Sequence, residues 1–227
     1  MKKTIYTELS YVIGMFTLAF SVALMERADF GMSMVVAPAY LLHLKVSQYL
    51  SFFSFGMAEY VLQAFLLIVL SLVVRKLKKG FLFSFVTAVL YGLVLDLCIK
   101  VVSYLPCEGF VWRLGFYLFG IVFCCVGVSF FFHTYISPEA YELFVKEIAD
   151  KLKAPISKVK TIYDCSSCAV AILMSFLFFG FGHFEGVKLG TVFCALVNGW
   201  LIGRISALLD RTFEFKDALK LRKFFTE

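Results

Sequence analysis

Six apolar stretches, each long enough to cross a lipid bilayer, restrict the folds that are open to this chain. They cover residues 6–25, 50–74, 80–103, 110–133, 159–181 and 188–209. A transmembrane helix needs about 20 mainly apolar residues, because the hydrocarbon core of a bilayer is about 30 Å thick. The remaining residues leave no room for a sizeable soluble domain. The sequence therefore predicts an all-α, polytopic membrane protein with six transmembrane helices in a single membrane domain over residues 1–227.

The composition favours lipid as the solvent. Hydrophobic residues make up 61% of the chain and the mean hydropathy is +0.89, whereas soluble domains are about half apolar. The basic N-terminus before the first stretch is typical of a signal peptide, but Glu26, Arg27 and Asp29 follow where a small-residue cleavage site would stand. We expect the first stretch to be retained as a transmembrane helix.

Lysine and arginine crowd alternate connections between the stretches, as the positive-inside rule requires. With the N-terminus inside, only five of the 22 basic residues fall on the outer side, namely Arg27, Lys45, Lys100, Arg113 and Lys188. We therefore expect a multi-pass protein of the cytoplasmic membrane with both termini in the cytoplasm. Topology explains the net charge of +6, so we expect the lipid bilayer and no nucleic acid as a partner. The oligomeric state stays open, a homo-oligomer included.

Neither the cysteines nor any other sequence motif predicts catalytic activity or metal binding. The seven cysteines lie mostly within apolar stretches, where they are typical of small buried side chains. Cys165 and Cys168 form a CxxC pattern, but no second pair supplies the four ligands of a zinc site. No phosphate-binding loop, zinc motif or nucleophile–base arrangement is present. We expect no cofactor, no metal and no enzymatic activity.

Two longer connections are predicted to contain short helices. Ser137-Pro138-Glu139 is typical of a helix start, and Ser157 is a candidate cap for the fifth span. Between them, apolar side chains fall on one face and charged ones, Glu142 included, on the other, which predicts an interfacial amphipathic helix. Residues 33–44 are almost entirely apolar, which favours a short helix packed within the protein or dipping into the bilayer.

The two halves of the chain resemble each other. Gly14 matches Gly120 and Arg27 matches His133, both at an offset of 106. Further matches join Ala39-Tyr40 to Ala140-Tyr141, Glu59 to Asp164, and Tyr91-Gly92 to Asn198-Gly199. The pattern predicts repeat one over residues 1–105, repeat two over residues 109–211, and a cytoplasmic tail over residues 212–227. Because each repeat has three spans, the second must be inverted, as in many secondary transporters. Chance matches between two apolar sequences are the alternative.

The second half also resembles the YczE/YitT-like bacterial integral membrane proteins. The resemblance is carried by Ser137-Pro138 through Tyr141, Lys160-Thr161-Ile162-Tyr163-Asp164, Gly182, Gly186, Gly190-Thr191, Asn198-Gly199 and Ile202-Gly203, and in the first half by residues 29–33. Asp164 stands where such relatives often have glutamate, and Asn198-Gly199 where they often have Gly-Pro. Those proteins are described as permeases of unknown substrate, so the resemblance implies a similar architecture and a permease role.

Ionisable groups within a span cost about 2.5–3.5 kcal/mol on insertion scales, so they are candidates for function. Glu59 lies about ten residues into the second stretch, Asp164 is its counterpart in the fifth, and Asp96 lies in the outer half of the third. We expect these acids to bind a small solute or an ion, with Gln63 facing the same interior. The competing interpretation is a protonated acid bonded to a neighbouring helix.

Other polar residues are assigned to gates or helix ends. Gly182, Gly186 and Gly190 straddle the last outer connection, which favours a re-entrant turn whose N–H groups, with Thr191, line the binding cavity. Arg27, His133 and Arg204 are candidate gating or interface residues. The competing interpretations are capping of helix ends, mutual pairing of Arg27 with its acidic neighbours, and snorkelling of Arg204 to the membrane surface.

Taken as a sequence, the chain is best interpreted as a small secondary transporter or permease. The solute, small and polar or cationic, would bind near Glu59 and Asp164. The alternative is a non-transporting scaffold or an accessory subunit of a larger assembly, which should tolerate Glu59→Gln and Asp164→Asn together. A membrane-embedded enzyme would need a cluster of catalytic groups, and the sequence shows none.

Overall fold

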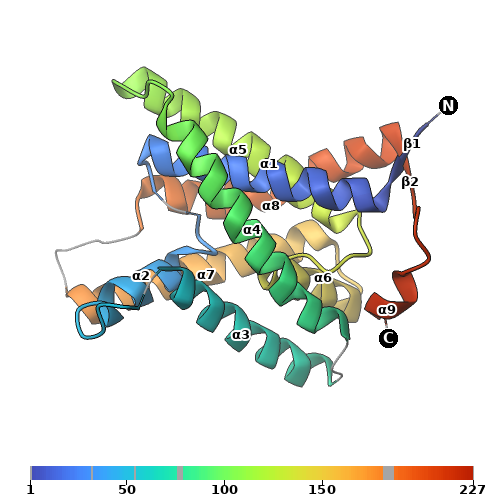
Figure 1. Cartoon of the computed structure of the whole chain (residues 1–227), viewed down its shortest axis with the longest axis horizontal. Helices are drawn as coiled ribbons and strands as arrows, with labels where there is room; N and C mark the ends of the chain where they lie inside the picture. The colour runs from blue at the N-terminus through green and yellow to red at the C-terminus, as the bar shows by residue number, and fades with distance from the viewer. Residues whose placement is uncertain (1, 32, 54, 76–78, 181–186, 227) are drawn as a thin grey trace.

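The computed structural model describes residues 2–31, 33–53, 55–75, 79–180 and 187–226, and these are mainly helical (Figure 1). The elements are β1 (Lys3–Tyr6), α1 (Thr7–Ala28), α2 (Ala37–Val46), α3 (Phe55–Val74), α4 (Lys79–Ser103), α5 (Phe110–Phe132), α6 (Ala140–Leu152), α7 (Ile156–Phe179), α8 (Leu189–Thr212), β2 (Phe213–Lys216) and α9 (Arg222–Thr226). Within the described chain, six helices are long and apolar enough to span a membrane: α1, α3, α4, α5, α7 and α8. The six-span prediction is confirmed.

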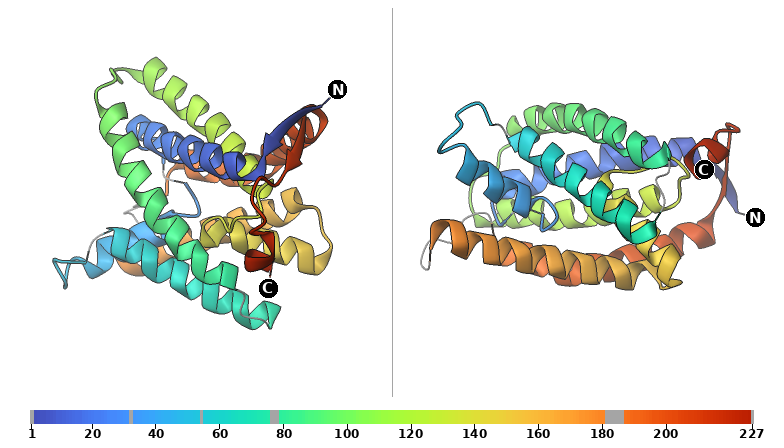
Figure 2. Two further views of the ribbon diagram at one scale, coloured as in Figure 1. Left: turned by 45° about the vertical axis from the view of Figure 1, so that its right-hand side comes forward. Right: turned by 90° about the horizontal axis from the view of Figure 1, so that it is seen from below.

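Helices α1 and α5 form the centre of the bundle. They are the most buried of the six spans, whereas most of α3, α4 and α7 faces outward, and both figures show α1 and α5 lying side by side (Figures 1 and 2). Glycines permit the close approach: a Cβ atom on Gly127 would lie 2.8 Å from the backbone nitrogen of Leu18 and 3.0 Å from the carbonyl oxygen of Gly14. The two backbones therefore touch, as small residues allow in membrane bundles.

The helix predicted in the connection between the fourth and fifth spans is present as α6, but its charged face is not fully solvated, because the helix packs against the bundle. Leu143 and Val145 are buried in apolar clusters shared with α3, α4 and α7, and Glu142 is also buried. Figure 1 shows α6 near the end of the molecule that holds the termini, with α2 at the other end. The charged face could turn inward because Glu142 finds a cationic partner on α7. Helix α2 is likewise packed within the protein, one of the two options predicted for residues 33–44.

The predicted caps also differ from the observed ones. Helix α6 begins at Ala140, and the carbonyl groups of Ser137 and Pro138 instead accept hydrogen bonds from Thr87 and Ser84 of α4. Ser157 lies inside the first turn of α7, which begins at Ile156 after Pro155. The start of α6 differs from the prediction because of the tertiary contacts with α4. The start of α7 differs because the helix begins directly after Pro155.

The two termini lie at the same end of the molecule. Strand β1 pairs in parallel with β2, and the carboxylate of Glu8 accepts hydrogen bonds from the N–H groups of Ala218 and Leu219 and from the hydroxyl of Tyr135. Phe225 of α9 packs against the rings of Phe83 and Tyr135. The segment predicted as a tail is therefore docked on the bundle. An even number of spans requires this arrangement of the termini.

At the opposite end, Asp29 joins α1 to α5 and α8. Its carboxylate lies 3.0 Å from the guanidinium of Arg113 and contacts the ammonium of Lys188. Arg27, for which pairing with its acidic neighbours was one of the competing interpretations, instead donates to the carbonyl oxygen of Leu105. The pKa of Asp29 is held below its usual range, chiefly by the hydrogen bond from Lys188 and then by the two positive charges. The ionised form of Asp29 therefore stabilises the fold.

Asp29→Asn should remove a pH-dependent part of the stability. Asparagine tolerates the left-handed backbone at this position (φ 56°). A carboxyl group with a lowered pKa stabilises the fold above its unfolded pKa of about 3.9, and this contribution is lost as the pH falls through the folded value. Thermal unfolding in detergent should show a higher melting temperature for the wild type at pH 6, with the difference shrinking below about pH 4. A difference that grows toward acid would contradict this assignment.

Candidate functional site

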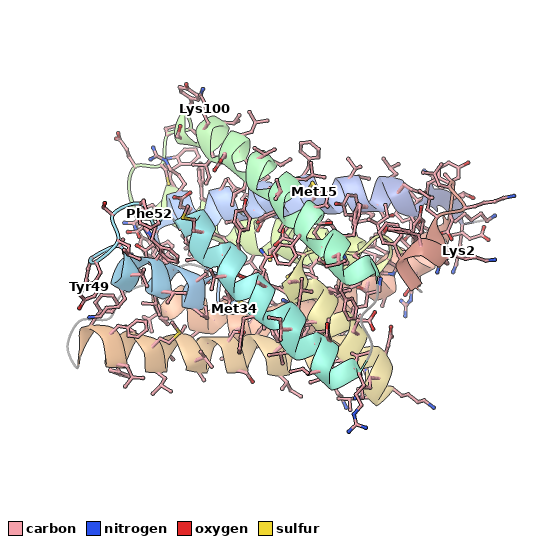
Figure 3. All side chains as sticks on the ribbon, turned by 60° about the horizontal axis from the view of Figure 1, so that its bottom comes forward. Lys2, Met15, Met34, Tyr49, Phe52 and Lys100 are labelled. Atoms are coloured by element: carbon pink, nitrogen blue, oxygen red, sulfur yellow. The ribbon has the colours of Figure 1, made fainter. Side chains whose placement is uncertain are left out.

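A cavity of about 420 Å³ lies inside the bundle, and each of the helices α1 to α8 contributes to its wall. Figure 3 shows Met34, one of its lining residues, in the interior between the helices, whereas Tyr49, Lys100 and Lys2 lie toward the ends. Most of the wall is apolar, but a group of acids, one lysine and several tyrosines interrupt it. A mainly apolar pocket with a few convergent polar groups is the usual form of a small-molecule site.

Glu59 lies in the wall and is held by α6. Helix α3 begins at Phe55, so Glu59 is in its second turn, nearer the helix start than the sequence suggested. The hydroxyl of Tyr141 donates a 2.6 Å hydrogen bond to Oε2 of Glu59, whereas Oε1 is buried and has no hydrogen-bond partner among the described residues. Gln63, one turn further along α3, is also buried in the wall, and its amide oxygen is likewise unpartnered within the described chain.

A second group of charges joins α6 to α7. The ammonium of Lys160 lies 2.9 Å from Oδ1 of Asp164 and 3.7 Å from Oε1 of Glu142, and all three side chains are at most 4% exposed. Lys160 and Glu142 line the cavity, whereas Asp164 lies behind Lys160. Buried charges of this kind persist only when they are paired. Lys160 is thus already engaged by two carboxylates.

Glu139 is the acid with the least compensation. It is 4% exposed, lines the cavity just before α6, and its Oε1 has no hydrogen-bond partner in the described part of the chain. Burial raises the pKa of Glu139 well above its usual range, and the neighbouring carboxyl groups of Glu142 and Glu59 raise it further. The surroundings of Glu139 therefore disfavour its charged form.

Aromatic rings cover much of the remaining wall. Tyr40 packs edge-on against Phe55, with ring centroids 5.8 Å apart, and both line the cavity together with Tyr60 and Tyr91. The hydroxyl of Tyr60 reaches to 4.0 Å from where a Cβ atom on Gly92 would lie, so this side chain extends from α3 to α4. The faces of such rings attract cations.

Asp96 lies in a more open part of the wall. Its side chain is exposed, as is that of Glu26 on α1, and both line the same cavity. His43 is also part of the wall and is fixed by a 2.9 Å hydrogen bond to the carbonyl oxygen of Phe53. The structure thus brings together Glu59, Gln63 and Asp96 in one cavity, with Asp164 one ion pair away.

Four predicted site residues lie away from the cavity. Thr191 forms a capping box with Lys188 at the start of α8. Arg27 lies at the end of α1, and Arg204 lies 5.3 Å from the ring of Trp200. His133 contacts Asp210 at 3.2 Å and stacks on a ring of β2. None of the four lines the cavity. Gly182 and Gly186 of the predicted re-entrant turn lie outside the described residues.

Four cavity residues were not predicted as site residues: Lys160, Glu139, Glu142 and Tyr141. In the sequence, Lys160 was interpreted as a topological charge and as part of the family resemblance, Glu139 as part of a helix start, and Glu142 as part of the charged face of an interfacial helix. One signal was available, because Lys160 and Asp164 are spaced to pair on one helix face. The other three residues reach the cavity only because α6 folds inward, which no local pattern indicates.

Comparison with known proteins gives a family and no function. No curated protein and no solved structure matches the chain. A family profile covers residues 5–207, which includes all six spans except the end of α8. That family carries no permease name, so the YczE/YitT-like resemblance stays a prediction. The chain belongs to DUF6198, a family of unknown function.

Proposed function

We propose that this protein is a small permease that carries a small polar or cationic solute through the cavity described above. The observation that carries the proposal is that Glu59 and Glu139 both line the cavity and each has one buried carboxyl oxygen, Oε1, without a hydrogen-bond partner among the described residues. Ionisable groups inside a membrane bundle are costly and are retained mainly where a solute or ion passes.

The crossing of α1 and α5 supports a build from two inverted repeats. The offset that pairs Gly14 with Gly120 also pairs Ser21 with Gly127. A Cβ atom on Gly14 would lie 3.0 Å from the carbonyl oxygen of Gly127, and one on Gly120 would lie 3.2 Å from that of Ser21. The contact of Gly14 with Gly127 therefore becomes the contact of Gly120 with Ser21 when each residue is replaced by its counterpart in the other half. Reciprocal contacts of this kind are what a two-fold axis produces.

Several of the residues that match between the two halves of the sequence also line the cavity. Tyr40 and Tyr141 both line it, as do Tyr91 and Asn198. Glu59 lines it directly, and its counterpart Asp164 holds the lining residue Lys160. Secondary transporters of inverted-repeat build bind their solutes at the interface between the repeats. The position of the cavity supports the same arrangement here.

The two halves differ in how tightly their last two spans pack. Helices α7 and α8 lie against each other along much of their length, whereas α3 and α4 make few contacts and diverge from their shared end (Figures 1 and 2). The cavity wall includes one face of α3 and one face of α4. In an alternating-access cycle, the second state would bring α3 and α4 together and separate α7 from α8.

Reconstituted protein should produce solute-driven currents that depend on Glu59. Liposomes on a solid support would be exposed to concentration jumps of small ammonium compounds, amino acids and sugars. We expect a current with at least one solute in the wild type and its loss in Glu59→Gln, because the charge that receives the solute is gone. Glu108→Gln, which changes an exposed loop acid, is the matched control and should keep the current.

Two outcomes would contradict the permease role. The first is an unchanged current in the double variant Glu59→Gln and Asp164→Asn. The second is a wild type that is folded, as judged by its thermal unfolding, yet passes no current with any solute in the panel. That second result would favour the scaffold or accessory subunit.

A further inference from the structure

We infer that the ligand of the cavity is an organic monocation, whose charge is received by Glu59 and Glu139 and whose apolar substituents contact the tyrosine and phenylalanine rings of the wall. This inference deepens the proposed function and uses the same cavity. It concerns binding, however, and can be tested without transport. Three properties of the wall support it, namely its charge, the spread of its acids and its aromatic rings, and the starts of α6 and α2 do not oppose it.

The charge of the wall favours a cation. Lys160 is engaged by Asp164 and Glu142 at 2.9 and 3.7 Å. In the described part of the chain, no lysine or arginine forms an ion pair with Glu59 or Glu139. A ligand cation would therefore supply the cationic partner that these two carboxyl groups lack, whereas an anion would be repelled by the excess of acidic groups.

Helix ends do not change that preference. The N-terminus of α6 contributes to the cavity wall and carries partial positive charge, but Glu139 is already its N-cap residue and Glu142 lies in its first turn, where acidic side chains are favoured. At the start of α2, the N–H groups of Val36 and Ala37 donate to the carbonyl oxygen of Ser33 at 3.1 and 3.0 Å, and Pro38 has no N–H group. Neither end offers a ready anion site.

The spread of the acids favours a diffuse charge over a compact ion. Calcium and magnesium need several oxygen ligands that converge on one point. Among the described residues, no three His, Cys, Asp or Glu side chains are grouped closely enough to hold a metal ion. Glu59 is on α3 and Glu139 precedes α6, so the two acids belong to different elements of the cavity wall. An ammonium with organic substituents can contact both.

The aromatic rings supply the remaining contacts. Tyr40, Tyr60, Tyr91, Tyr141 and Phe55 all line the cavity. The faces of aromatic rings attract a substituted ammonium that they surround. A volume of about 420 Å³ is near the lower end for ligand sites, so the cavity suits a small cation with a few methyl or methylene groups.

Isothermal titration calorimetry of the full-length protein in detergent tests the inference. The probes are tetramethylammonium, choline and tetraethylammonium, with 3,3-dimethylbutan-1-ol as the neutral isostere of choline and glycine betaine as its zwitterionic analogue. We expect at least one ammonium to bind, and choline to bind about tenfold or more tighter than its neutral isostere. Because cation binding favours the ionised form of Glu139, whose pKa is raised by burial, affinity should rise with pH and protons should be released.

Substitutions of single residues test which side chains contact the ammonium group. Glu59→Gln should weaken ammonium binding by about tenfold or more, because an isosteric amide removes only the charge. Tyr60→Leu should weaken it more than Tyr60→Phe, which keeps the ring. Tyr104→Leu, at an exposed loop position, is the control and should bind as the wild type does.

Several results would overturn the inference: no binding of any of the three ammonium ions, equal binding of choline and its neutral isostere, tighter binding of betaine than of choline, or unchanged affinity in Glu59→Gln. The outcome is separable from that of the permease proposal. Ammonium binding without solute currents would overturn the permease and keep the inference. Currents carried by a neutral solute or a sugar, with no ammonium binding, would do the reverse.

Discussion

Lys160→Met should destabilise the protein by about 3 to 5 kcal/mol, the usual cost of removing one partner from a buried ion pair. The change leaves Asp164 and Glu142 without the ammonium that lies 2.9 and 3.7 Å away, in a site where neither carboxyl is more than 4% exposed. Methionine fills a similar volume, so the lost charge dominates over lost packing. Thermal or urea unfolding in detergent at pH 7 measures the effect.

The double variant Lys160→Met with Asp164→Leu should be more stable than Lys160→Met alone, because it removes the carboxylate that lost its partner. Lys158→Met, on the same helix but exposed, should leave stability unchanged. The ion-pair assignment would be wrong if Lys160→Met and Lys158→Met melted at the same temperature.

The architecture could be predicted from the sequence because it depends on one strong local signal. Lipid requires every span to be a long apolar helix, so hydropathy alone located all six. The second span began too early in the prediction, at residue 50 instead of Phe55. Residues 50–53 are apolar except for Ser51, but they form a turn, in which the N–H of Phe53 donates to the carbonyl oxygen of Leu50. Hydropathy does not distinguish an apolar turn from the start of a helix.

Part of the candidate site could also be predicted from the pattern of apolar and polar residues. Glu59, Gln63 and Asp96 stand out as polar residues in apolar stretches, and all three line the cavity. Thr191 stands out equally, yet its side chain caps α8 beside Lys188. A polar side chain in a span can cap the backbone of its own helix or line a cavity, and residue spacing does not distinguish these two roles.

The rest of the site depends on long-range packing. Glu139, Tyr141 and Glu142 reach the cavity because α6 turns inward between α3 and α7. In sequence they lie on a charged helix in a basic connection, which usually means a membrane surface. The partner that makes burial of Glu142 tolerable is Lys160, 18 positions away on the next helix. Only the fold shows that these two charges meet.

Gly127→Leu should be a second strongly destabilising change, at the crossing of α1 and α5. A Cβ atom at this position would lie 2.8 Å from the backbone nitrogen of Leu18 and 3.0 Å from the carbonyl oxygen of Gly14. Backbone atoms cannot rotate away as a side chain can, so the two central helices must separate. Overpacking of this kind costs about 1–3 kcal/mol or more, which exceeds the gain of about 1 kcal/mol from replacing a helical glycine.

Gly115 provides the matched control on the same helix, because a Cβ atom there would meet nothing within 4 Å. Gly115→Leu should therefore be neutral or slightly stabilising in the same unfolding measurement. Gly120→Leu should be destabilising, since its Cβ atom would lie 3.2 Å from the carbonyl oxygen of Ser21. Losses at Gly127 and Gly120 together are what a reciprocal crossing of two inverted repeats requires. A loss at only one of them would count against the two-fold relation, even if that crossing itself is tight.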